Sequence, residues 1–83
     1  MSKLSVDNLK KLLENEDYLQ AKNKAQELVE NNYNNIELWE IISEAEVELK
    51  ENADLSYSRL IELYIENENP SKAMDTLDQL IKI

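Results

Sequence analysis

The stretches Asp17–Ala21 (DYLQA) and Asn69–Ala73 (NPSKA) mark the starts of two matching helices. In both, a polar residue is followed four positions later by an alanine, and apolar residues stand four and seven positions after that alanine. That spacing places the alanine and the apolar side chains on one stripe of a helix. Because an alanine lets a neighbouring helix approach closely, the two stretches predict closely paired helices.

The rest of the chain, read outward from these two helices, shows the same kind of periodicity. The predicted helices cover residues 4–14, 17–32, 35–51, 54–67 and 70–82. Short connections force consecutive helices to run antiparallel. The sequence therefore predicts an all-α fold of about five antiparallel helices in a single domain, 1–83, built as an α-solenoid or as an irregular helical bundle.

Capping residues and apolar stripes support these ranges. Asp17 with Gln20, and Asn34 with Glu37, fit the pattern of a capping residue and its partner three positions later. Asn69 is the expected cap of the last helix. The third helix carries apolar residues on more than one face, as expected of a central helix. The stripe of the last helix is predicted to be Ala73, Met74, Leu77, Leu80 and Ile81.

The segment 57–80 carries a set of apolar positions divided between two helices. They are Tyr57, Leu60, Ile61 and Tyr64 on the first, and Ala73, Leu77 and Leu80 on the second. This pattern resembles a tetratricopeptide repeat. Asp17-Tyr18-x-x-Ala21 likewise resembles the start of a repeat's second helix, and Trp39 with Ile42 and Ser43 resembles the start of the next first helix.

This sequence departs from the tetratricopeptide pattern in two respects. Ile61 and Leu80 stand where the family has small residues, so both would push the two helices apart. Ala21 and Ala73 lie 52 residues apart, whereas the family repeats about every 34 residues. We therefore expect one irregular junction between residues 36 and 57.

The composition excludes several classes of site. The chain has no glycine, which excludes glycine-dependent phosphate loops, and no histidine, which removes the usual general base and the commonest metal ligand. It has no cysteine and hence no disulfide, which fits a reducing compartment such as the cytoplasm. We expect a cytoplasmic protein that is not an enzyme and that binds no cofactor or metal.

The charge of the chain restricts its partners. The net charge is −9, from 18 acidic and 9 basic residues. Nucleic acid and anionic membrane surfaces would repel such a chain. No apolar stretch is long enough to span a membrane. The expected partner is a protein or peptide that is neutral, apolar or basic.

A ridge of acidic residues follows one face of the third predicted helix, at spacings of three and four residues. Its members are Glu37, Glu40, Glu44, Glu48 and Glu51. The ridge is a candidate docking stripe for a basic partner segment, and the alternative is a solvated outer face. An acidic protein of this kind could also mimic nucleic acid and block a basic nucleic-acid-binding surface.

Two further sets of residues are candidates for partner binding. Trp39, Tyr57 and Tyr64 could line a groove for a partner helix, or could fill the core between helices. Leu80 and Ile83 lie near an apolar C-terminal edge that could self-associate, bind a partner or fold back on the fourth helix.

Together these features predict a non-enzymatic protein–protein interaction module that binds a protein or peptide segment through a helical groove or an apolar edge. The resemblance to tetratricopeptide repeats implies the same class of function. The alternatives are a small acidic chaperone for one helical client, similar to the tetratricopeptide-like chaperones of bacterial secretion systems, the acidic mimic, and a structural domain that forms homo-oligomers through the C-terminal helix.

Overall fold

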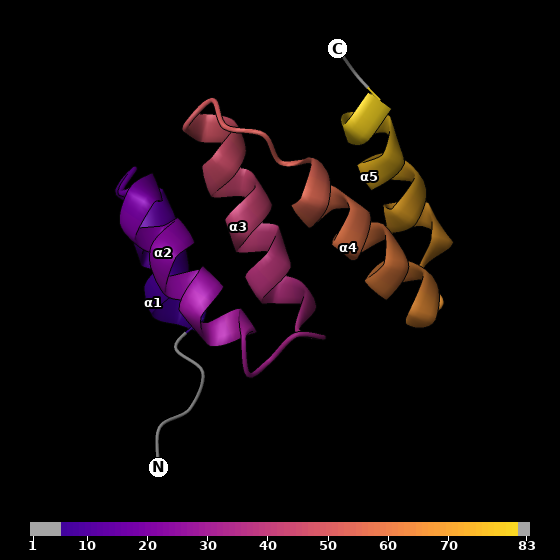
Figure 1. The fold of residues 1–83 in the computed structure, drawn as a ribbon, viewed down its shortest axis with the longest axis horizontal. Helices are drawn as coiled ribbons and strands as arrows, with labels where there is room; N and C mark the ends of the chain where they lie inside the picture. The colour runs from indigo at the N-terminus through magenta and orange to yellow at the C-terminus, as the bar shows by residue number, and fades with distance from the viewer. Residues whose placement is uncertain (1–5, 82–83) are drawn as a thin grey trace.

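The computed structural model describes residues 6–81, most of which lie in five α-helices (Figure 1). No β-strand occurs between residues 6 and 81. The all-α prediction is confirmed, and every observed helix lies within its predicted range. Residues 4, 5 and 82, predicted to be helical, are outside the described part. The helices are α1 (Val6–Glu14), α2 (Tyr18–Val29), α3 (Ile36–Glu48), α4 (Asp54–Glu66) and α5 (Pro70–Ile81).

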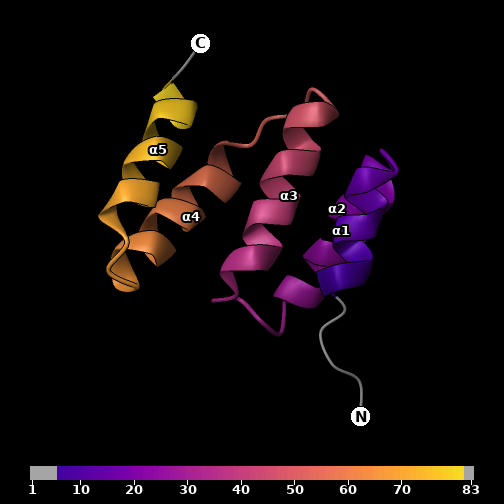
Figure 2. The same ribbon diagram turned by 180° about the vertical axis from the view of Figure 1, so that it is seen from behind.

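The five helices follow one another in space as they do along the chain. α1 packs against both α2 and α3, and α2 packs against α3. α4 packs on α3, whereas α5 contacts α4 alone within residues 6–81. In Figure 1 α1 lies behind α2, and the view from behind in Figure 2 brings α1 to the front. The fold is thus a three-helix unit extended on one side by the α4–α5 hairpin.

The hydrophobic core is centred on α3, which packs against neighbours on both sides. Its buried residues are Leu38, Trp39, Ile41, Ile42, Ser43 and Ala45, so the prediction of more than one buried face is confirmed. Ala21 and Ala25 of α2 have no exposed surface, as the predicted stripe requires. Burying each large apolar side chain contributes about 1.5–3 kcal/mol.

The stripe predicted for the last helix is only partly buried, and this prediction was wrong in part. Ala73 and Thr76 are buried and Leu80 is half-buried, whereas the other three apolar side chains are exposed. The physical reason is that α5 has one neighbouring helix in the described part of the chain, so it buries a narrower stripe than a helix with two neighbours. The exposed fractions are 61% for Met74, 40% for Leu77 and 64% for Ile81.

Three helices end in a left-handed residue without any glycine. Glu16, Lys50 and Glu68 have φ values of 62°, 63° and 57°. Each follows its helix in the position that glycine usually takes in a Schellman motif. The paired hydrogen bonds of that motif are present, for example Asp17 N to Leu12 O at 2.8 Å and Glu16 N to Leu13 O at 3.0 Å.

The helix starts confirm the predicted cap at Asn69, confirm the position of the cap at Asp17 without its side-chain bond, and correct the cap of α3. The Asn69 Oδ1 accepts a hydrogen bond from Lys72 N, as predicted. The cap of α3 is Asn35, whose Oδ1 accepts from Leu38 N at 3.0 Å, and not Asn34. Asp17 is the N-cap residue of α2, as predicted, but its carboxylate accepts from the side chain of Gln20 and not from a backbone N–H of the helix.

Candidate functional site

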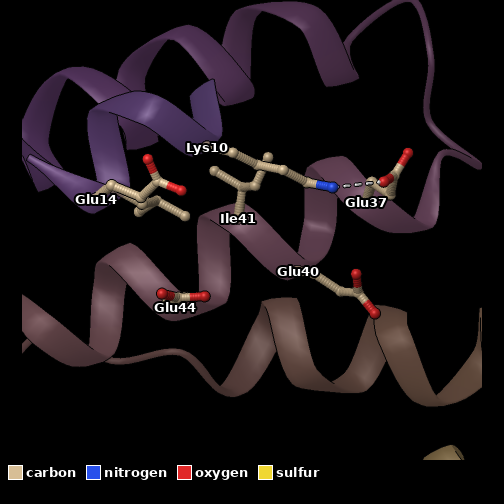
Figure 3. Close-up of a pocket in the computed structure, with 7 residues that line it drawn as sticks. Lys10, Glu14, Glu37, Glu40, Ile41 and Glu44 are labelled. Atoms are coloured by element: carbon tan, nitrogen blue, oxygen red, sulfur yellow. Dashed lines mark hydrogen bonds and ion pairs between the residues drawn. The ribbon is translucent and has the colours of Figure 1, made fainter. Parts of the chain in front are cut away.

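The face of α3 that carries the predicted glutamate ridge opens onto a hollow between α1 and α3. This hollow, the acidic groove, has a volume of about 340 Å³. Figure 3 shows Lys10 and Glu14 on the α1 side and the glutamates along α3. The lining residues are Lys10, Leu13 and Glu14 from α1, and Glu37, Glu40, Ile41 and Glu44 from α3.

The charges that line the acidic groove are mostly negative and only partly compensated. Lys10 Nζ donates to Glu37 Oε2 at 3.0 Å, with about half of each side chain exposed. The hydrogen bond and the charge of Glu37 both raise the pKa of Lys10. Within residues 6–81, Glu14 and Glu44 make neither an ion pair nor a side-chain hydrogen bond. Lys10 therefore compensates one of the four lining carboxylates, and no other ion pair between residues 6 and 81 reaches the remaining three.

Glu40 occupies the wall of the acidic groove that faces α4. Its Oε2 accepts a hydrogen bond from the Oη of Tyr64, which joins α3 to α4. Burial, and next the hydrogen bond to Glu40, raise the pKa of Tyr64 far above its ordinary value of 10.0. Tyr64 thus stays a hydrogen-bond donor over the whole physiological pH range and holds the Glu40 carboxylate in place.

The other two members of the predicted ridge lie outside the acidic groove. Glu51, beyond the end of α3, accepts from Lys22 Nζ of α2. Glu48 is exposed and does not line the hollow. The packing of α1 and α2 therefore divides the ridge into a groove-lining part and a part that is peripheral to it.

The three predicted aromatic residues line no common hollow among the described residues; Trp39 and Tyr64 belong to the hydrophobic core and Tyr57 packs against it. Trp39 is buried and lines a second hollow, and Tyr64 is buried beside Glu40. Tyr57 is half-buried against the core. Leu80 is half-buried on α5, and Ile83 lies outside the described residues.

Sequence reasoning missed the α1 wall of the acidic groove. Lys10, Leu13 and Glu14 are three and four residues apart, which places them on one side of a helix. That spacing was the available signal, but only the packing of α1 on α3 shows that this side meets the glutamates.

The chemistry of the acidic groove is electrostatic and aliphatic. Between residues 6 and 81 no three Asp or Glu side chains are grouped so that they could hold a metal ion. No helix in the described part of the chain is long and apolar enough to cross a membrane. Comparisons with models of protein families, with curated proteins and with solved structures found no match. The tetratricopeptide resemblance therefore stays a prediction.

Proposed function

We propose that this chain is a non-enzymatic protein-interaction module that binds a basic segment of a partner protein in the acidic groove. The observation that supports the proposal is the combination of an aliphatic lining, Leu13 and Ile41, with four carboxylates and one ammonium group. Lysine and arginine carry a charged head on an apolar stem, so a segment rich in them suits both parts of the lining. The lack of cysteine fits action in the cytoplasm.

The expected affinity is modest and depends on salt. One exposed ion pair contributes at most about 1 kcal/mol, so several pairs and the burial of aliphatic stems must act together. The net charge of −9 also attracts a basic segment over a distance and raises the association rate. A nucleic-acid-binding protein whose basic surface is blocked in this way is one form of such a partner.

A helical peptide of leucine and lysine tests the proposal. Titration calorimetry would compare the unchanged chain with the double variant Glu14→Gln/Glu44→Gln, which removes the two lining carboxylates that make neither an ion pair nor a side-chain hydrogen bond within residues 6–81. The matched control is Glu27→Gln/Glu66→Gln, which removes the same charge from exposed positions outside the groove. We expect the groove variant to bind about three- to tenfold more weakly at low salt, and the control to bind nearly as the unchanged chain does.

Two further measurements make the test sharper. Lys10→Gln removes the chain's own cation from the groove, so it should strengthen binding of the peptide. Added salt should weaken binding, because it screens exposed charges. Equal weakening by the groove and control variants would show that only net charge matters, and the proposal would then be abandoned.

The exposed strip on α5 favours a second candidate, an acidic chaperone that covers an apolar helical client. Met74, Leu77 and Ile81 form this strip, and no helix within residues 6–81 packs on it. A client helix bound there should be lost in the variant Met74→Gln/Ile81→Gln, while the acidic groove keeps its peptide. A mass that rises with concentration in the unchanged chain, but not in the variant, would instead indicate a homo-oligomer formed through α5.

A further inference from the structure

A second hollow lies where the loop before α3 meets α4. This aromatic hollow has a volume of about 300 Å³. It combines buried and exposed apolar groups, since Trp39 is 8% exposed, Tyr33 57% and Leu55 78%. Trp, Tyr and Arg are the residues most enriched at the energetic centres of protein interfaces. The lining consists of Tyr33, Trp39, Leu55, Ser58, Arg59 and Glu62, and includes the chain's single tryptophan and single arginine.

The walls of the aromatic hollow are held in place before any partner arrives. Trp39 Nε1 donates to the Tyr33 carbonyl oxygen at 2.7 Å. The rings of these two residues meet edge to face, with centroids 5.6 Å apart. The Arg59 guanidinium lies 4.1 Å from the centroid of the Tyr33 ring. A rigid wall of this kind loses little conformational entropy when a ligand binds.

Arg59 has hydrogen-bonding capacity that the chain does not use. Its Nη1 donates to Glu62 at 2.8 Å, and its Nη2 donates to Asn34. Its Nε is buried and has no hydrogen-bond partner among residues 6–81. Glu62 is the only acid in the lining, and its side chain is 64% exposed, so this carboxylate is readily displaced. Arginine pairs best with a carboxylate that meets two of its N–H groups.

We infer that the aromatic hollow is a second docking site, which binds a protein segment that presents a large apolar side chain next to a carboxylate. The apolar side chain fills the hollow between Trp39 and Leu55. The carboxylate takes the place of Glu62 on Arg59. The charge preference is thus opposite to that of the acidic groove.

This second site is separate from the acidic groove. Trp39 of the aromatic hollow and Ile41 of the acidic groove are two residues apart on α3, which places them about 160° apart around the helix axis. The two hollows therefore open on opposite sides of α3. The inference does not rest on the proposed function of the acidic groove, and either site can exist without the other.

The fluorescence of Trp39 reports directly on the aromatic hollow, since the chain has no other tryptophan. The probe is a short acetylated peptide with one phenylalanine between two glutamates, titrated at physiological salt to screen the remote acidic residues. Two control peptides replace the phenylalanine with alanine or the glutamates with lysines. We expect the first peptide to change the Trp39 emission in a saturable way, and each control to bind at least about fivefold more weakly.

Variants of exposed residues separate a docking role from a structural one. Leu55→Ala should weaken binding about fivefold without changing the unfolding midpoint, whereas Ile65→Ala, an exposed apolar change on the same helix, should leave affinity unchanged. Glu62→Gln should strengthen binding, because it removes the competing carboxylate. Glu14→Gln/Glu44→Gln should have no effect here.

Four outcomes would overturn the inference. They are the absence of saturable binding, equal binding of the alanine peptide, equal binding of the lysine peptide, and equal effects of Leu55→Ala and Ile65→Ala. None of them bears on the acidic groove, which is tested with a different peptide and different variants.

Discussion

Replacing the left-handed helix-end residues with glycine should stabilise this protein. The variants are Glu16→Gly, Lys50→Gly and Glu68→Gly, all at positions with φ near +60°. An L-residue in this conformation costs about 1–2 kcal/mol. Glycine removes that cost but adds about 0.5–1 kcal/mol through the greater freedom of the unfolded chain. The net gain expected at each site is therefore about 0.5–1 kcal/mol.

The three changes should be nearly additive, because each lies at the end of a different helix. The triple variant is then more stable by about 1.5–3 kcal/mol. That gain is large beside the roughly 3–5 kcal/mol typical of a domain of this size. Thermal unfolding followed by circular dichroism should show a rise in midpoint of roughly 10 °C. Urea unfolding would give the free energy directly.

The charges of the three residues provide an internal control. Glu16→Gly and Glu68→Gly lower the net negative charge, whereas Lys50→Gly raises it. If relief of charge repulsion were the cause, the two glutamate variants would be stabilised and the lysine variant destabilised. Alanine at the same positions removes the charge but keeps the backbone strain, so it should give little gain. Stabilisation by alanine equal to that by glycine would refute the reasoning. As a control, Glu27→Gly places glycine inside α2, where it should lower the stability of the protein by about 1 kcal/mol.

Two other predictions concern the core and the α3–α4 contact. Changing Ile42, which is 1% exposed, to alanine should lower the free energy of unfolding by about 2–5 kcal/mol, and circular dichroism should then show a largely unfolded chain. The control Leu19→Ala, at an exposed site, should change the free energy of unfolding by less than about 0.5 kcal/mol. Burial raises the pKa of Glu46 above its ordinary value of 4.5, against the opposing hydrogen bond from Ser56. Because the folded state then binds the proton more tightly than the unfolded state, the charged Glu46 destabilises the fold at neutral pH, and stability should rise as pH falls through the raised pKa. Glu46→Gln should be more stable than the unchanged chain at neutral pH, and an equal pH dependence in the two proteins would contradict this assignment.

The sequence predicted the helices well because their signals are local. The helix ranges and the cap at Asn69 depend only on nearby residues, and the structure confirms them. The Asn34 prediction failed by one position because both Asn34 and Asn35 can cap a helix, and the side chain of Asn34 accepts from Arg59 instead. The choice between them depends on the position of α4, which no local pattern contains.

The candidate sites were harder to predict because they combine residues that are distant in sequence. The periodicity of the third predicted helix placed Glu37, Glu40 and Glu44 on one face, but not the Lys10 and Glu14 that complete the groove. The aromatic hollow needs Tyr33 from a loop and Leu55 and Arg59 from α4. Part of the apolar stripe of α5 is exposed because few helices pack on α5. The spacing of apolar residues predicts the stripe, but not how many helices will cover it.

The order in which the helices contact one another has a consequence for how the chain folds. Apart from the contact of α1 with α3, each helix in the described part of the chain packs only on the helix before and after it in sequence. Contacts of such short sequence separation need little loop closure, so folding should take microseconds to milliseconds. During synthesis each of these five helices is made after the helix on which it packs, so α4 and α5 would meet α1–α3 already synthesised.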